Sequence, residues 1–164
     1  MCIRDRNRRA SILDSSFKIS PAFFANRTKM ADEYEFYLQA SVRGYHAYFK
    51  ESTVHVGDIL DCEMEPENDH DRYAVAVKNK DEKIVGHVPI ELSRICHKFL
   101  SEYGQLEAEC IGSRFNTGQG KGLELPVDYR FVGNARYLRK VFTRLQKKQE
   151  EEEMDWKISG ITKV

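Results

Sequence analysis

The chain has 164 residues, which is enough for one domain with a hydrophobic core and too few for two substantial domains. Lysine and arginine together number 26, as do aspartate and glutamate, so net charge gives no global attraction to nucleic acid and any such site must be a local patch. No apolar run approaches the roughly 20 residues of a membrane-spanning helix, so we expect a soluble protein without membrane contact.

The N-terminal segment differs in composition from the rest of the chain. Residues 1–29 carry seven lysines and arginines against two aspartates. A basic, serine-containing start is typical of a mitochondrial transit segment, but Met30 and the residues after it also make a natural start. We expect residues 1–34 to be disordered or non-native.

Residues 35–44 and 58–64 each alternate apolar and polar side chains, which predicts two β-strands. The apolar face of the first strand is made of Phe36, Leu38, Ala40 and Val42. The loop between the two strands contains aromatic and cationic residues. Such side chains either present a binding surface or fold down over the end of a barrel, and both roles stay open for this loop.

Residues 65–77 (EPENDHDRYAVAV) join an acidic turn to an alternating strand that begins at Tyr73. Pro66 fixes its own φ, and residues such as Asn68 and Asp71 have short side chains that hydrogen-bond to nearby backbone in turns. We therefore expect an ordered polar loop, followed by a strand with one buried face. A rigid scaffold that presents a polar loop is the usual arrangement of a binding site, so we expect the function to lie here.

Residues 73–78 and 83–88 predict a β-hairpin, because the four polar residues between them suit a short turn. A helix is predicted over residues 89–103. Pro89 fits its first turn, Gly104 fits its C-terminal end, and the residues at helical spacing are apolar. These residues are Leu92, Ile95, Cys96, Phe99 and Leu100.

Two more strands are predicted at residues 105–112 and 123–133, separated by a basic, glycine-rich loop. This loop has G-x-G-x-G spacing and precedes a strand, so it is not a phosphate-binding loop. Asn134 can cap a second helix, whose basic faces are more often solvated than bound to nucleic acid. We interpret residues 150–164 as an acidic and then flexible tail, although Trp156 could dock on the domain.

Six strands, one helix inserted after the fourth strand and a C-terminal helix predict a mainly β fold of the α+β class. We expect residues 35–149 to form a small OB-like or SH3-like β-barrel. Barrels of this kind bind single-stranded nucleic acid along one face.

The four cysteines are widely spaced, and the sequence has no C-x-x-C pair and no secretory signal. These features indicate reduced thiols in an intracellular protein, nuclear or cytoplasmic. The sequence also lacks paired Cys/His ligand spacing, a Walker-type loop and a recognisable pair of nucleophile and base. We therefore expect no cofactor, no metal and no enzymatic activity.

Four segments, in this order and spacing, resemble the HIRAN domain, and the similarity covers residues 38–133. The segments are Gly44-Tyr45-His46, residues 65–71 with Ala74-Val75-Ala76-Val77, Val85-Gly86-His87-Val88-Pro89, and Leu123-Glu124-Leu125-Pro126. That family is a β-barrel found at the N-terminal side of Swi/Snf-type helicases and as a stand-alone module. In the helicase-like transcription factor branch it binds single-stranded DNA at a free 3′-hydroxyl and supports the handling of stalled replication forks. The family's zinc binding and hydrolysis belong to neighbouring domains.

The resemblance carries roles to individual residues. Asn68 and Asp71 stand where that branch uses an amide and a carboxylate at the DNA end. A carboxylate accepts a hydrogen bond from a terminal hydroxyl and repels a terminal phosphate, which would allow end discrimination. His87 matches a histidine of the fourth strand, for which a structural role is an equal alternative. His70 replaces a tyrosine and can still stack on a base.

The sequence departs from the family pattern at three other positions. A base-stacking aromatic aligns with Ala47, a phosphate-binding lysine with Ile90 and a second aromatic with Leu123. His46 and Tyr48 flank the first of these positions. Each lost stacking contact removes about 1–3 kcal/mol, so the resemblance implies weaker DNA binding than in that branch.

The first hypothesis is a monomeric module that binds single-stranded DNA or DNA 3′ ends, in DNA repair or replication-fork contexts. Its candidate nucleic-acid-binding residues are Arg43, His46, Tyr48, Lys50, Asn68, His70, Asp71, Arg72 and His87. The second hypothesis is a protein-interaction barrel that keeps the fold without binding DNA, which the lost aromatic and lysine positions favour.

Overall fold

The structure is a computed structural model that describes residues 32–164 except 49, 51–52, 103 and 121. The prediction for the N-terminal segment therefore falls largely outside the described residues. Its last two positions, Glu33 and Tyr34, already belong to the first strand. The first strand thus begins two residues before the predicted boundary at residue 35.

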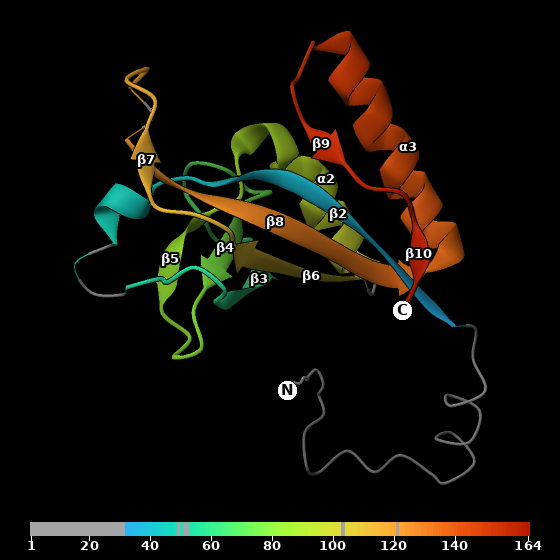
Figure 1. The fold of residues 1–164 in the computed structure, drawn as a ribbon, viewed down its shortest axis with the longest axis horizontal. Helices are drawn as coiled ribbons and strands as arrows, with labels where there is room; N and C mark the ends of the chain where they lie inside the picture. The colour runs from blue at the N-terminus through green and yellow to red at the C-terminus, as the bar shows by residue number, and fades with distance from the viewer. Residues whose placement is uncertain (1–31, 49, 51–52, 103, 121) are drawn as a thin grey trace, which may run out of the picture. The chain divides into compact units, whose positions relative to one another are not determined.

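A single antiparallel sheet forms the body of the described region (Figure 1). Its main path runs β10-β2-β8-β6-β3-β4-β5, with β7 added to β8 and β9 added to β2. The longest pairing joins β2 and β8 from Glu33↔Asn134 to Val42↔Leu125. The strands are β2 (Glu33–Val42), β3 (Ile59–Met64), β4 (Val75–Lys78), β5 (Ile84–His87), β6 (Gln105–Cys110), β7 (Phe115–Asn116), β8 (Leu123–Asn134), β9 (Lys157–Ile158) and β10 (Thr162–Lys163).

Both predicted helices are present, as α2 (Ile90–Ser101) and α3 (Ala135–Glu151). Helix α2 begins at Ile90, so Pro89 is its N-cap with an extended backbone and not a residue of the first turn as predicted. Helix α3 is capped as expected, because the backbone N–H of Tyr137 donates to Asn134 Oδ1 at 3.1 Å. A short 3-10 helix, η1 (Tyr45–Ala47), follows β2.

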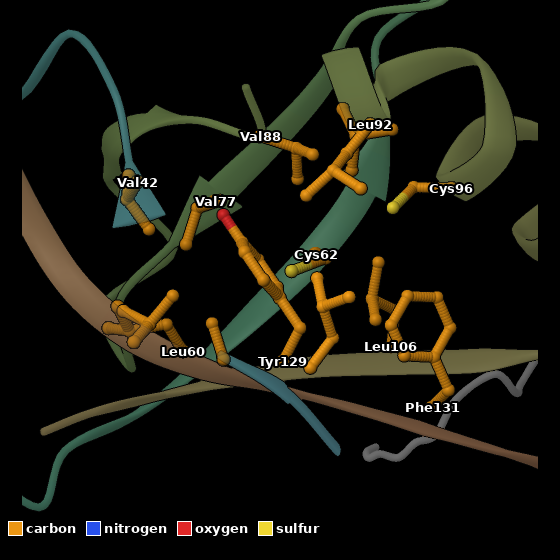
Figure 2. Packing of buried hydrophobic residues seen from close by; sticks show 14 of the residues in the cluster. Val42, Leu60, Cys62, Val77, Val88, Leu92, Cys96, Leu106, Tyr129 and Phe131 are labelled. Carbon is orange, nitrogen blue, oxygen red and sulfur yellow. The ribbon is translucent and has the colours of Figure 1, made fainter. Parts of the chain in front are cut away.

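The core lies between the sheet and the two helices. Figure 2 shows Leu92 and Cys96 of α2 facing Cys62 and Tyr129, all within one buried cluster. Phe36 of β2 stacks on a neighbour in β8, Phe131, with ring centroids 4.7 Å apart. Each fully buried side chain of this size contributes about 1.5–3 kcal/mol through removal of apolar surface from water.

The predicted α+β class, mostly β with two helices, is confirmed, but the ladder does not close into a barrel. The strand path is open, and its β2 and β5 regions meet through one isolated bridge between Arg43 and His87. Arg43 N donates to His87 O at 2.9 Å, and His87 N donates to Arg43 O at 2.8 Å. This bridge fixes the end of β2 beside the end of β5.

Strand β4 begins at Val75, two residues later than predicted, and is buried on both faces. Asp71 explains the late start, because its side chain accepts from Tyr73 N and its carbonyl accepts from Ala74 N. These two N–H groups therefore belong to the turn. The expectation of one exposed face was wrong, since Ala76 is as fully covered as its neighbours.

The C-terminal residues are part of the sheet, so the expectation of a flexible tail was wrong for them. Strands β9 and β10 both pair with β2. Tyr37 N donates to Ser159 Oγ at 2.8 Å, and Ser159 N donates to Tyr37 O at 2.9 Å. This pairing provides hydrogen-bond partners for backbone groups of β2 on the edge away from β8. The local composition of the C-terminal residues does not reveal this long-range pairing.

Gly86 provides a test of the bridge, because a Cβ at this position would lie 2.5 Å from both Arg43 O and Val42 Cγ1. We expect Gly86→Ala to lower the free energy of unfolding by about 1–3 kcal/mol through overpacking. Urea denaturation measures the change. Gly160→Ala is the matched control, since a Cβ at residue 160 would have no neighbouring atom within 4 Å. Equal stability of the two variants would contradict the close approach at Gly86.

Candidate nucleic-acid interface

The acidic turn is held together by the side chain of Asn68. Its Oδ1 accepts from the backbone N–H groups of His70 and Asp71 at 2.8 and 3.0 Å, and its Nδ2 donates to Glu65 Oε1 at 2.7 Å. We call residues 65–71 the Asn68 loop. The predicted order of this loop is confirmed, and it arises from the turn chemistry that the sequence indicated.

Asp71 fastens the Asn68 loop to helix α2. One carboxylate oxygen accepts from Tyr73 N at 2.8 Å, and the other accepts from Ser93 Oγ at 2.9 Å. Ser93 is buried in the first turn of α2. Each oxygen of an ionised carboxylate has two acceptor sites, so Asp71 keeps capacity for one further donor per oxygen.

Glu65 connects the Asn68 loop to strand β5. Its Oε1, which already accepts from Asn68, also accepts from His87 Nε2 at 2.9 Å. Burial acts to raise the pKa of Glu65, but the hydrogen bonds from Asn68 and His87 outweigh it and hold this pKa below its ordinary value. Glu65 is therefore ionised at neutral pH. Within the described residues its Oε2 has no hydrogen-bond partner.

Tyr48 lies beside His87. The two ring centroids are 6.3 Å apart with a tilted arrangement, and both side chains are half-buried. The structure thus brings Tyr48, His87, Asn68 and Asp71 into one connected group, with Glu65 as the link. His46 lies in η1, and its side chain is outside the described residues. Lys50 is exposed and forms no hydrogen bond or ion pair within the described part of the chain.

Arg43, a predicted phosphate contact, is occupied inside the domain. Its Nη1 donates to both carboxylate oxygens of Glu91 at 2.6 and 2.9 Å. Its Nε lies 3.5 Å from the buried carboxylate of Glu124, which also accepts from Ser41 Oγ at 2.6 Å. The guanidinium therefore joins the end of β2 to α2 and compensates a buried charge.

A second cluster beside Asp71 was not recognised from the sequence. The guanidinium groups of Arg72 and Arg94 lie 4.8 and 5.2 Å from the ring centroid of Tyr73. His97 meets the same ring edge-on at 5.5 Å. The sequence placed Tyr73 in a strand and Arg94 on a helix, and only the tertiary contact between loop and helix brings them together. His70 and Arg72 are exposed.

The described residues contain no group of three or more His, Cys, Asp and Glu side chains placed to hold a metal ion. No helix in the described part of the chain is both long and apolar enough to cross a membrane. Three cysteines, Cys62, Cys96 and Cys110, are free and buried. Burial raises the pKa of the Cys62 and Cys96 thiols, so both are protonated at neutral pH.

Comparison with known proteins gives a consistent match. The family model for the HIRAN domain matches residues 35–135. The crystal structure of the HIRAN domain of human HLTF has a TM-score of 0.59 at 21% identity, covering 71% of this chain and 93% of that one. The NMR structure of the HLTF HIRAN domain in its DNA-bound conformation has a TM-score of 0.52 at 22% identity, covering 68% and 87%. At these identities the structural likeness establishes the fold. No curated protein matches the chain.

The hydrogen bond between Glu65 and His87 gives a pH-dependent prediction. Because the folded-state pKa of Glu65 is lowered, the stability it contributes is present above its unfolded pKa near 4.5 and is lost as the pH falls through the folded value. We expect Glu65→Gln to cost up to about 1 kcal/mol of unfolding free energy at neutral pH, since the pair is partly exposed. Urea unfolding from pH 7 down to pH 3 should show this difference shrinking. A difference that is independent of pH would contradict the assignment.

Proposed function

The chain belongs to the HIRAN domain family, and from that premise we propose that the Asn68 loop binds single-stranded DNA at a free 3′ end. The observation that carries the proposal is the shared Glu65 Oε1, which holds the loop amide and the ring of His87 on one carboxylate. This oxygen holds carboxylates and a ring side by side. We call the connected group of Glu65, Asn68, Asp71 and His87 the corner. The HLTF HIRAN domain, whose fold this chain shares, has been seen in a DNA-bound conformation.

Two carboxylates supply the proposed end recognition. Asp71 retains acceptor capacity on both oxygens, and Glu65 Oε2 has no partner within the described residues. A terminal 3′-hydroxyl can donate to either group. A terminal phosphate only accepts and carries negative charge, so it would be repelled. Preference for a free hydroxyl therefore has a direct electrostatic cause.

Rings and cations around the corner supply the remaining contacts. The half-buried rings of Tyr48 and His87 and the exposed ring of His70 can each stack on a base, at about 1–3 kcal/mol per stacked base. Arg72 and Lys50 are exposed and can meet phosphates. Arg43 is not assigned this role, because Glu91 already holds its guanidinium. In this proposal Asn68 acts by positioning Asp71 rather than by touching DNA.

We propose a monomeric binding module without catalytic activity, working inside the cell in the nucleus or cytoplasm and in DNA repair or replication. The support comes from its family and from the buried, free thiols of Cys62, Cys96 and Cys110, which suit a reducing compartment. No step of the proposed recognition needs a metal or cofactor.

A protein-interaction module is the second candidate. The observation that favours it is the internal use of Arg43 and Asn68, two residues expected to contact DNA. In that case the corner would be a structural element of the domain. Failure to bind any oligonucleotide at low salt would support this candidate.

Asp71 gives the direct test of end recognition. We expect an oligonucleotide with a free 3′-hydroxyl to bind roughly tenfold or more tightly than its 3′-phosphorylated form, the value of one charge-assisted hydrogen bond. Asp71→Asn should strongly reduce this preference and leave the loop in place, because its Oδ1 can still accept from Tyr73 N and its amide N–H can donate to Ser93 Oγ, which also reaches Ile90 O. Fluorescence anisotropy with labelled oligonucleotides measures both affinities.

Two controls separate recognition from general charge repulsion. A 5′-phosphorylated oligonucleotide carries the same added charge and should bind as tightly as the unmodified one. Asp69→Asn removes an exposed acid from the same loop and should keep the preference for a free 3′ end. An equal effect of the Asp69 and Asp71 substitutions would overturn the assignment.

The two arginines flanking the site should behave differently. Arg72→Gln should keep the free energy of unfolding within about 0.5 kcal/mol of the wild-type value. It should also reduce the slope of log K against log salt concentration for single-strand binding by about 0.7, the value of one phosphate contact. Arg43→Gln should lower the free energy of unfolding by about 2 kcal/mol, because it removes a charge-assisted pair and leaves Glu124 buried without its cation. Denaturation and salt titrations of both variants check the distinction.

A further inference from the structure

A groove between helices α2 and α3 lies outside the site described above. It has a volume of about 790 Å³ and is lined by the second half of α2 and the first half of α3. Its floor is apolar, with Phe99 at 1%, Ile95 at 6% and Val141 at 7% exposure. These three floor residues are already buried within the domain, so none of them can serve as an apolar anchor for a protein partner.

The rims of the groove are strongly basic. Arg136, Lys140 and Arg144 line it from α3 and follow one another at intervals of four residues. This spacing places them on one helix face, about 6 Å apart along the axis. Lys98 of α2 faces them, and Arg139 also lines the groove, whereas Glu102 is the one acidic residue in its lining.

These cations are not neutralised within the domain. Among the described residues Lys98, Arg136 and Arg144 make no ion pair, and Lys140 lies over the ring of Tyr137. Farther along α3, by contrast, Lys147 and Lys148 pair with Glu151 and Glu152. The positive charge therefore remains available only along the first half of the helix, where the groove lies.

Helix α2 contributes residues both to the groove and to the contacts of the Asn68 loop. Asp71 binds Ser93, and the next residue, Arg94, contacts the ring of Tyr73. Lys98 follows Arg94 by four residues and therefore lies on the same face of the helix. Two cations of α2, Arg94 and Lys98, therefore lie on the helix face between the Tyr73 ring and the groove.

We propose that this groove binds the sugar-phosphate backbone of the same nucleic acid strand, on the 5′ side of the end held by the Asn68 loop. This inference rests on the proposed function and extends it from the terminal nucleotides to the strand behind them. Regularly spaced, unpaired cations match a polyanion with a repeating charge. The covered floor favours such a ligand over an acidic peptide, which would need apolar anchors to bind firmly.

The test compares a trinucleotide with a twelve-nucleotide single strand, both with free 3′ ends, against the full chain. The groove variant is Lys98→Gln/Arg136→Gln/Arg144→Gln, and the charge-matched control is Lys80→Gln/Lys83→Gln/Lys147→Gln, from exposed positions outside the groove. Wild type should bind the longer strand more tightly. The groove variant should lose this gain, lower the salt slope for the longer strand by about 2, and bind the trinucleotide as wild type does.

The outcomes separate this inference from the proposed function. Trinucleotide binding without any gain for the longer strand, or equal losses in both triple variants, would overturn the groove assignment alone. The longer strand could also bind more tightly through the groove residues, with equal affinity for free and phosphorylated 3′ ends. That result would support the groove assignment and reject end recognition. A glutamate-rich peptide of the same net charge that binds wild type as tightly as the longer strand would reject the assignment to nucleic acid.

Discussion

The arrangement of the site depends on one carboxylate oxygen, Glu65 Oε1, which accepts from both Asn68 and His87. On one side it closes the loop whose backbone Asn68 organises, and on the other it holds the ring that borders Tyr48. Burial opposes ionisation of Glu65, but its two donors more than compensate. A charged acceptor is therefore kept at the surface at a fixed position, which is the requirement for recognising a hydroxyl donor.

Local patterns in the sequence predicted most of the fold. Alternation found β2, β3, β6 and β8, helical spacing found both helices, and Asn134 caps α3 as its residue type implied. The Asn68 loop was predictable for the same reason, because its hydrogen bonds span no more than three residues. Interactions between sequence neighbours are encoded by neighbouring residue types, so a single sequence is sufficient to read them.

Contacts between distant segments were not predictable in this way. Glu91 accepts hydrogen bonds from Arg43, which lies 48 positions earlier in the sequence. Arg43, predicted to contact DNA, therefore has a structural role. The contact between Tyr73 and Arg94 and the pairing of β9 and β10 with β2 also join separate parts of the chain. A two-residue strand has no periodicity of its own, and its existence depends on an unpaired edge nearby. The groove between α2 and α3 arises likewise from helix packing.

The most direct test of the account is an NMR titration of the protein with a short single strand that has a free 3′-hydroxyl. The account predicts that the backbone amides of His70, Asp71 and Tyr73 shift together, because all three donate to the side chains that form the corner. The ring of His87 should shift with them. Shifts confined to other surfaces, with these amides unchanged at saturating DNA, would contradict the claim that the Asn68 loop is the binding site.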